Sequence, residues 1–368
     1  MTVSLRVVLD QLVDVVDADV AEAETQIARA LVATAPRGCV VEAIVPAGSE
    51  GAVPDAAAVA EVTKAPLTRA KLSAAWQLGI APGLNRGLIH APSLMAPLVR
   101  HDRVNDNDQT VITVWDLCAW EVPDAMPRGA VAWHRSMVKR AEKYADAVIV
   151  PAHALAERLS EASPKLHSRI RVIPGAAPLG FAVPSDAVGR RRELMLPDEL
   201  IVLAAGRCDD AALAAGLAAI ASLGDEHAVV VLDIAEGGES RVEDLAAAAG
   251  LRAEVVHSRA SLSPADRAAV FGAALAVVAP SALTAFPWRV VDAMALGVPV
   301  VAIASPIHQE ILLDGGSLAP AEGLGEALAE VLSTDANRRR ASVRAADRGS
   351  SFSWRDHAER VWALHAEL

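Results

Sequence analysis

The stretch "PSALTAFPWRVVDAMALGVPVV", residues 280–301, decides the fold class of this chain. The apolar run before Pro280 predicts a β-strand that ends at this proline, and a loop follows it. Pro287 suits the first turn of a helix, and Gly297 ends that helix just before the next apolar strand. A strand, a helix and a second strand in this order form one unit of an α/β fold.

The same order recurs through the whole sequence. Short runs rich in Val, Ile and Leu alternate with Ala-rich stretches of helical character. The runs are LRVVLD, CVVEAIV, GLIHAP, TVITVWD, ADAVIV and RIRVIP in the first half, and LIVLAAG, AVVVLDI, AEVVHS, ALAVVAP and VPVVAIA in the second. Because these strands are continuously apolar and helices follow them, we expect parallel sheets with helices on both faces.

A segment rich in Pro and Gly, residues 174–192, separates the two series of strands and predicts a linker. The length of 368 residues also suits two domains rather than one. We therefore predict two Rossmann-like, doubly wound parallel-sheet lobes that flank a cleft, over residues 1–178 and 179–350. Ligands of such sheets bind where the strands end, beside helix N-termini.

Composition indicates the compartment and excludes some partners. The net charge of −12 argues against a nucleic-acid-binding protein, which needs a basic face. The three cysteines have no paired spacing, which is typical of a reducing compartment and excludes a thiolate metal site. Arg6 and Asp10 interrupt the first apolar run, which therefore reads as a strand and not as a signal peptide. We expect a cytoplasmic protein.

A set of segments with a specific order and spacing covers nearly the whole chain. The set comprises GLIHAPSLMAPL, VITVWDLCAWEVPD, KRAEKYADAVIVPAHALAERL, RIRVIPGAA, LAAGRCDD, the stretch 280–302 and FSWRDHAERV. In this order the segments resemble the family-4 retaining glycosyltransferases of the GT-B fold, especially an actinobacterial group. The resemblance implies an acceptor-side first lobe, a donor-side second lobe, and a C-terminal helix, residues 351–368, that returns to the first lobe.

The resemblance also implies catalytic candidates on the acceptor side. The His-Asp pair of the family corresponds to Trp115 and Asp116. An indole accepts no proton, so Trp115 either packs in the core or stacks on a sugar face. Asp116 lies at a predicted strand end, and His90 in GLIHAPS ends another strand. His90 is a polar candidate on this side, or else a semi-buried imidazole.

The diphosphate clamp of the family is missing on the donor side. Its Arg and Lys correspond to Ala211 and Ala212, which leaves Arg207, directly after the strand-end Gly206, as the nearest cation. A hydrogen bond to a charged group contributes about 1.5–3 kcal/mol, so losing two weakens nucleotide-sugar binding roughly 10²- to 10⁴-fold. Gly206 and Arg207 remain as donor-binding candidates.

Four further donor-binding candidates follow two strands of the second half. By the resemblance, Asp292 replaces the family glutamate that holds the ribose hydroxyls, and Thr284 replaces the one that contacts the transferred sugar. His308 and Glu310 begin a helix after VPVVAIA, where free amides bind a phosphate or a sugar. Alternatively, Glu310 stabilises the first turn of that helix.

A basic helix and two acidic triplets complete the candidates. The helix over residues 128–143 carries Arg135, Lys139 and Lys143 on one face, which suits either an anionic membrane surface, a lipid-pyrophosphate acceptor or plain solvent. The triplets DAD at 17–19 and DND at 106–108 lack further ligands nearby. We therefore expect no metal ion and no cofactor.

Two functions compete at this point. The first is transfer of a hexose or deoxyhexose from a nucleotide-sugar to a cell-surface polysaccharide or a lipid-linked acceptor, in the cytoplasm or at the inner face of the membrane. The second is a catalytically degenerate protein of the same fold that assists an active glycosyltransferase, since the phosphate clamp is lost. A nucleotide-sugar epimerase is a weaker third alternative because no motif favours it.

Overall fold

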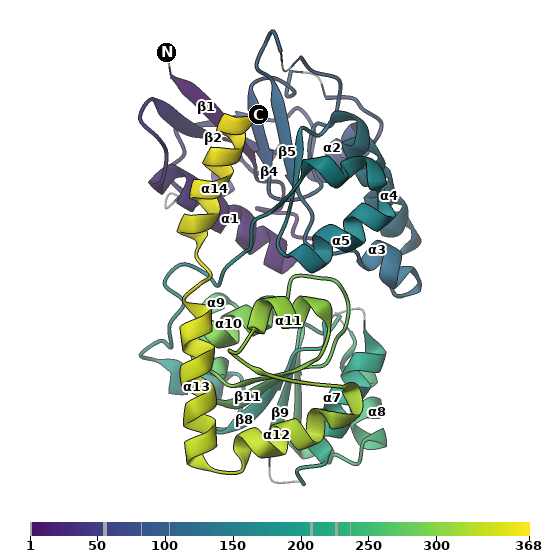
Figure 1. Ribbon diagram of the computed structural model, residues 1–368, viewed down its shortest axis with the longest axis vertical. Coiled ribbons are helices and arrows are strands. Elements are labelled where there is room, and N and C mark those ends of the chain that lie inside the picture. Colours follow the sequence, from purple (N-terminus) through teal and green to yellow (C-terminus); the bar gives the residue numbers. More distant parts are fainter. Residues whose placement is uncertain are drawn as a thin grey trace. The chain divides into compact units, whose positions relative to one another are not determined.

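The computed structural model describes residues 2–53, 57–81, 83–102, 104–206, 209–224, 227–235 and 237–368 (Figure 1). The chain divides into two compact units. Unit 1 comprises Met1–Gly175 and Ser353–Leu368, and unit 2 comprises Ala176–Phe352. The sequence predicts boundaries after residues 178 and 350. In the structure the division falls close to these positions, after Gly175 and after Phe352.

Unit 1 is built on a sheet of seven parallel strands in the order β3-β2-β1-β4-β5-β6-β7. The strands are β1 (Val3–Val8), β2 (Cys39–Val45), β3 (Glu61–Lys64), β4 (Leu88–Ala91), β5 (Gln109–Thr113), β6 (Ala147–Val150) and β7 (Ile170–Val172). The apolar runs of the first half overlap all of these strands except β3. The short edge strand β3, EVTK, has no buried residue, and so the sequence shows no apolar run there.

Helices cover both faces of this sheet. Those from the first part of the chain are α1 (Ala18–Ala33), α2 (Arg69–Gln77), α3 (Cys118–Glu121), α4 (Arg128–Tyr144) and α5 (His153–Ala162). The last helix, α14 (Trp354–Glu367), packs beside α1 (Figure 1). Its buried residues recur every three or four positions, and Trp362 Nε1 donates to the carbonyl of Leu31 in α1 at 3.1 Å.

Unit 2 repeats the plan with six parallel strands in the order β10-β9-β8-β11-β12-β13. They are β8 (Leu200–Leu203), β9 (Ala228–Leu232), β10 (Val256–Arg259), β11 (Ala274–Ala279), β12 (Val300–Ile303) and β13 (Ser317–Ala319). The edge strand β13 lies outside the predicted runs because it is short and only partly buried. The prediction of two Rossmann-like α/β lobes is confirmed.

Eight helices of unit 2 lie in the described ranges: α6 (Ala187–Glu193), α7 (Asp210–Ala221), α8 (Glu239–Ala248), α9 (Pro264–Phe271), α10 (Trp288–Ala295), α11 (Pro306–Leu312), α12 (Leu324–Leu332) and α13 (Asp335–Gly349). Helix α6 begins inside the segment that the sequence predicts to be an irregular linker. Its buried Arg191 donates to the carbonyl of Ala269 in α9 at 3.2 Å, which fixes the helix on this unit. No helix of the described part of the chain is long and apolar enough to cross a membrane.

Candidate functional site

Each unit has a topological switch point, where the order of its strands reverses. In unit 1 it lies between β1 and β4, and in unit 2 between β8 and β11. The carboxyl ends of the two strands at a switch point diverge into helices on opposite faces, which leaves space for a ligand. These two strand edges are therefore the places where polar side chains matter most.

At the switch point of unit 1, two acidic side chains lie buried together. Asp10 follows β1 and is 1% exposed, and Glu24 lies on α1 and is fully buried. Arg69 donates Nε to Asp10 Oδ2 at 2.8 Å, and Ser93, after β4, donates its hydroxyl to Oδ1 at 3.1 Å. Burial raises the pKa of Glu24 well above its usual value, and the neighbouring Asp10, which shares a hydrogen bond with it, raises it further.

The loop after β1 is ordered by the same group of side chains. Glu24 Oε2 accepts the backbone N–H of Gln11 at 3.1 Å. The Gln11 side-chain oxygen accepts the N–H groups of Val16 and Asp17, at 3.0 and 2.8 Å. Asp17 in turn caps α1 by accepting from two amides of its first turn. The amides that could bind a phosphate at this helix start therefore already have acidic partners.

The predicted catalytic residues of unit 1 lie mostly inside its core. Trp115 is 5% exposed, and its indole N–H donates to the carbonyl of Pro92 at 2.7 Å. Its ring stacks on His357 of α14, with centroids 6.5 Å apart and planes at 17°. Asp116 is half-buried, and its Oδ1 accepts the backbone N–H of Cys118 at 2.9 Å, which starts α3. Of these residues, Asp116 is the more accessible to a ligand.

His90, in β4, belongs to a group of three buried histidines, of which the other two, His357 and His365, lie on α14. Its ring is fully buried and lies 5.9 Å from the ring of His365, and neither of its nitrogens has a hydrogen-bond partner in the described part of the chain. Burial lowers the pKa of His90 well below its usual value, and lowers the pKa of both His357 and His365 to about 4. The three imidazoles are therefore neutral in the folded protein at neutral pH.

At the edge of unit 2, Asp292 lies in a buried chain of ion pairs. It is 2% exposed, and its Oδ2 accepts from Arg267 Nε at 2.7 Å and from Arg289 Nη1 at 3.0 Å. Arg289 also holds Asp233, after β9, through two hydrogen bonds of 2.7 and 3.0 Å. Asp233 takes a backbone φ of +59°, an uncommon conformation for a residue with a side chain. Two arginines and two aspartates thus neutralise one another.

The first loop of unit 2 keeps part of the predicted donor site. Gly206 is exposed at the end of β8 and has a φ of +78°, which glycine adopts without strain. Arg207 lies outside the described residues. Asp209 caps α7 by accepting the N–H of Ala212 at 2.9 Å, and it also accepts the hydroxyl of Ser281 at 2.7 Å. An acidic group therefore lies at this helix start, where a phosphate would bind.

The remaining donor-side candidates differ in their burial. Thr284 is half-buried in the loop after β11. His308 is 3% exposed inside α11, its Nδ1 lies 3.1 Å from Ser305 Oγ, and burial lowers its pKa to about 4. Glu310 is half-buried, and its backbone carbonyl accepts from Arg348 at 3.0 Å. Thr284 and Glu310 are thus accessible in part, whereas His308 is enclosed.

The interpretation of the sequence missed the group around Asp10. An acid directly after the strand LRVVLD and a second acid among the small apolar residues of α1 are visible in the sequence. Their spacing of fourteen positions gives no motif, because the two meet only when α1 folds back over β1. Among the described residues, no three His, Cys, Asp or Glu side chains gather as metal ligands.

Comparison with known proteins identifies similar folds. Residues 190–348 match the sequence model of a family described as "Glycosyl transferases group 1". No curated protein matches the chain significantly. The structure of HepE from Anabaena in complex with UDP-glucose has a TM-score of 0.73 at 15% identity, covering 99% of this chain and 100% of that one.

Two further solved structures are similar over their whole length. Sucrose-phosphate synthase from Thermosynechococcus elongatus gives a TM-score of 0.69 at 21% identity, covering 99% of this chain and 98% of that one. WaaG, a glycosyltransferase involved in lipopolysaccharide biosynthesis, gives 0.65 at 15%, covering 98% of each chain. The two-lobe architecture of this chain is therefore that of the GT-B glycosyltransferase structures.

Proposed function

We propose that this protein transfers a hexose or deoxyhexose from a nucleotide-sugar to a cell-surface polysaccharide or a lipid-linked acceptor. The match of residues 190–348 to the group 1 glycosyltransferases carries this proposal, because the segment includes β8 to β13 and with them the whole switch point of unit 2. HepE, a protein of similar fold, has been solved with UDP-glucose. Within this class we propose a divergent, actinobacterial-type member of the retaining family 4.

Unit 2 would hold the nucleotide-sugar at the carboxyl ends of β8 and β11. Gly206 is exposed there, and its φ of +78° turns the chain from the strand towards α7. Thr284 would offer a hydroxyl to the sugar, and Glu310 a carboxylate. In unit 1, Asp116 would face the acceptor. We propose that the reaction needs no metal ion, since the chemistry of transfer is assigned to these side chains and backbone amides.

A second function is favoured by the ion pairs of Asp292. A carboxylate that accepts from two buried arginines is a poor partner for a ribose, because a ligand would have to displace a charged hydrogen bond. The acid at the start of α7 also repels a diphosphate. The alternative is a protein without catalytic activity that binds and assists an active glycosyltransferase.

The location of the protein forms part of the proposal. We propose that it acts in the cytoplasm, with α4 in peripheral contact with the inner face of the membrane. Lys139 and Lys143 are exposed on this helix, which supports contact with anionic lipid. Arg135 is exposed as well, but its guanidinium is held by two hydrogen bonds to the carbonyl of Ala119. The contact should therefore depend on the lysines and be lost in the Lys139→Gln, Lys143→Gln double variant.

Calorimetric titration with UDP-, GDP- and dTDP-sugars separates the two functions. A transferase should bind one donor with a Kd below the millimolar range. The Ala211→Arg variant tests the missing clamp, because Ala211 is exposed at the start of α7 whereas Ala212 is only 6% exposed. One added charged hydrogen bond should tighten binding at least roughly 10-fold. Ala218→Arg adds the same charge to an exposed position of α7 two turns away and is the matched control.

The outcomes are distinct. Binding by the wild type that strengthens in Ala211→Arg and not in Ala218→Arg supports the transferase. Binding by Ala211→Arg alone supports the assisting protein with a degenerate site. If neither binds any nucleotide-sugar, the transferase proposal is wrong, and so is the correspondence that places the lost phosphate clamp at Ala211.

A further inference from the structure

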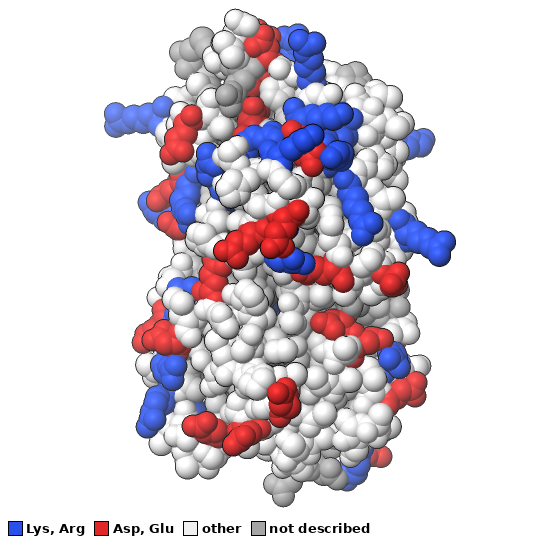
Figure 2. Space-filling view, turned by 45° about the vertical axis from the view of Figure 1, so that its right-hand side comes forward, with Lys and Arg blue, Asp and Glu red and all other residues white. Residues whose placement is uncertain are grey.

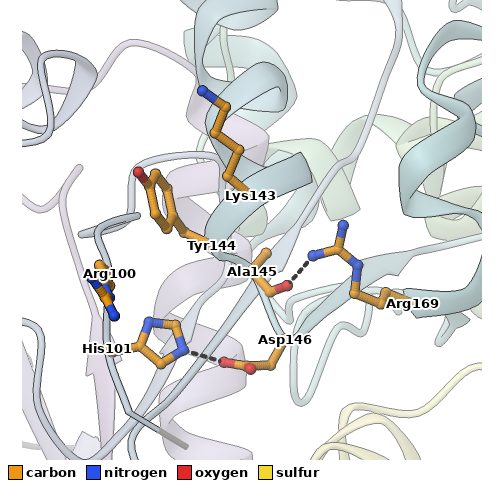
Figure 3. A pocket seen from close by; sticks show the side chains of 7 residues that line it. All are labelled: Arg100, His101, Lys143, Tyr144, Ala145, Asp146 and Arg169. Atoms are coloured by element: carbon orange, nitrogen blue, oxygen red, sulfur yellow. Dashed lines mark hydrogen bonds and ion pairs between the residues drawn. The ribbon is translucent and has the colours of Figure 1, made fainter.

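A cationic pocket lies in unit 1 at the amino ends of its strands, away from the edge that holds Asp10 and Asp116. Its volume is about 660 Å³, and it is lined by Arg100, His101, Lys143, Tyr144, Ala145, Asp146 and Arg169 (Figure 3). Residues 143–146 join the end of α4 to the start of β6, and Arg169 directly precedes β7. The pocket is therefore separate from the proposed transfer site.

One side of the pocket is fixed by Arg169. Its guanidinium donates to four backbone carbonyls, which include those of Glu142 at 2.7 Å and Ala145 at 2.5 Å. These carbonyls lie at the C-terminal end of α4, where the helix dipole is negative. Arg169 thus stabilises the helix end that presents Lys143 and Tyr144, and its charge remains beside the pocket.

The floor of the pocket is formed by a His–Asp pair. His101 Nε2 lies 2.8 Å from Asp146 Oδ2 (Figure 3). Its Nδ1 lies 3.0 Å from the carbonyl of Val99. The same Asp146 oxygen accepts the N–H of Thr110 at 2.8 Å. The hydrogen bond to Asp146 raises the pKa of His101, and the carboxylate of Asp108 adds to this. Since both ring nitrogens have acceptors nearby, the protonated imidazolium fits this position.

Three donors of the pocket are available to a ligand. The Arg100 guanidinium, the Lys143 ammonium and the Tyr144 hydroxyl make no hydrogen bond or ion pair to any residue of the described ranges. The nearby Asp102 carboxylate accepts instead from Val104, at 3.0 Å, and from Asn105. In the view of Figure 3 the ring of Tyr144 lies on the same side of Ala145 as Arg100 and His101.

The charges of the pocket do not balance. Arg100, Lys143, Arg169 and the imidazolium of His101 outnumber the nearby carboxylates. These are Asp146 in the lining, and Asp102 and Asp108, which interact with Arg100 and His101. The protein as a whole has a net charge of −12. On the face shown in Figure 2, Lys and Arg side chains gather over unit 1. A volume of about 660 Å³ is within the size range of small-molecule sites. We propose that this pocket binds the phosphate group of a ligand, with Arg100, Lys143 and Tyr144 as donors and His101 as a fixed positive charge.

Titration of the full-length protein with inorganic phosphate and pyrophosphate, at constant ionic strength, tests the proposal. The wild type should bind pyrophosphate more tightly than phosphate, since it offers more oxygens and charge. The Arg100→Gln, Lys143→Gln variant should bind pyrophosphate at least roughly 10²-fold more weakly, because it lacks two charged donors. Tyr144→Phe should show a smaller loss, since only a neutral hydroxyl is removed.

A matched control removes two charges elsewhere. Arg338 and Arg355 lie on α13 and α14, far from the pocket in sequence, with side chains 39% and 79% exposed. The Arg338→Gln, Arg355→Gln variant should bind pyrophosphate as the wild type does. Equal weakening in both double variants, or no binding by the wild type, would overturn the proposal, since the anion would then respond only to overall charge.

Vesicles distinguish the two sources of a phosphate group. Sedimentation with phosphatidylcholine vesicles that contain phosphatidic acid, and with vesicles of phosphatidylcholine alone, tests a lipid headgroup. Binding that needs phosphatidic acid, that pyrophosphate displaces and that Arg100→Gln alone weakens indicates a lipid source, since Arg100 plays no part in the proposed membrane contact of α4. Pyrophosphate binding without vesicle binding indicates a soluble phosphorylated ligand. Both results support a phosphate site, and failure of both probes contradicts it.

Discussion

The two units share one topology, but different sets of charges lie at the carboxyl edges of their sheets. In unit 1, the acids Asp10 and Glu24 lie buried with Arg69 as their cation. In unit 2, the acids Asp233 and Asp292 are matched by Arg267 and Arg289. The strand orders are equivalent over six strands, and β7 is an additional strand at the edge of the sheet in unit 1. The same backbone frame therefore supports one site with an excess of acid and one that is neutral.

This difference predicts how each unit responds to a change of pH or to the loss of one charged side chain. Where two carboxylic acids face a single cation, burial favours protonation of one of them, and the raised pKa of Glu24 reflects this. Where acids and arginines are matched in number, the ion pairs are sensitive to the loss of a partner instead. Unit 1 should thus respond to pH, and unit 2 to substitution.

The largest effect is expected from Asp292→Asn in unit 2. The substitution leaves Arg267 and Arg289 buried and without a full counter-charge. Breaking a buried ion pair from one side lowers the free energy of unfolding by about 3–5 kcal/mol. Urea unfolding followed by circular dichroism measures it. A loss of unfolding free energy below about 1 kcal/mol would mean that the two arginines find other partners, and that the four charged side chains do not stabilise one another.

Acidification should act next most strongly, and mainly on unit 1. His357 and His365 have a pKa of about 4 when folded, against about 6.5 in an unfolded chain. The unfolded state therefore binds more protons between these values, and the free energy of unfolding falls as the pH drops through this window. From pH 7 to pH 5 each histidine should lower it by about 2 kcal/mol, and His90 adds to the loss.

Hydrogen exchange at pH 7 and pH 5, corrected for the intrinsic rates, locates this loss. Peptides from β4 and β5 should lose more protection than peptides from β11 and β12, because, among the described residues of unit 2, only His308 has its pKa lowered to about 4. Equal losses in both units would show that His90, His357 and His365 do not control the acid response of unit 1.

Glu24→Gln should have a smaller effect with the opposite pH dependence. Since the folded pKa of Glu24 is raised, the native state binds the extra proton, and wild-type stability falls as the pH rises from about 4.5 towards the raised value. The amide does not titrate. As the pH rises, the free energy of unfolding of the variant should therefore increase relative to that of the wild type, by at most about 1.4 kcal/mol per pH unit. Urea midpoints between pH 5 and pH 8 measure the gain, and parallel curves would argue against a shared proton.

The smallest effect is expected at the surface of unit 2. Asp210 and Arg241 form an ion pair of 3.1 Å, with both side chains more than half exposed. Asp210→Asn should change the free energy of unfolding by less than about 1 kcal/mol, since solvent screens such pairs. Because it removes the same type of charge as Asp292→Asn, it is the control for that variant. A large loss here would weaken the argument from burial.

The sequence predicts the frame of both units well, because continuous apolar runs mark buried parallel strands. It misses β3 and β13, whose short edge positions bury little. The sites are harder to predict. Asp292 gains its partners from residues 25 and 3 positions away, and Arg289 meets Asp233 56 positions away. Such pairings depend on how helices pack, which no local pattern in the chain specifies.

The same reason separates His90 from its predicted catalytic role. In the sequence it follows an apolar strand and precedes a loop, as a site residue would. In the structure its ring is covered by α14, whose residues come from the other end of the chain. Asp116 and Gly206, whose exposure depends only on the strand that each follows, lie where the sequence predicts them.

The position of α14 in unit 1 has a consequence for synthesis. During translation, residues 1–175 leave the ribosome first, and all of unit 2 follows before residues 353–368 emerge. Until then the strand that carries His90, and the surface of α1 that accepts Trp362, lack their cover. Unit 2 is one continuous segment and can fold without waiting for any later residue. The nascent chain thus completes its second unit before its first, and the exposed face of unit 1 is where a chaperone would bind.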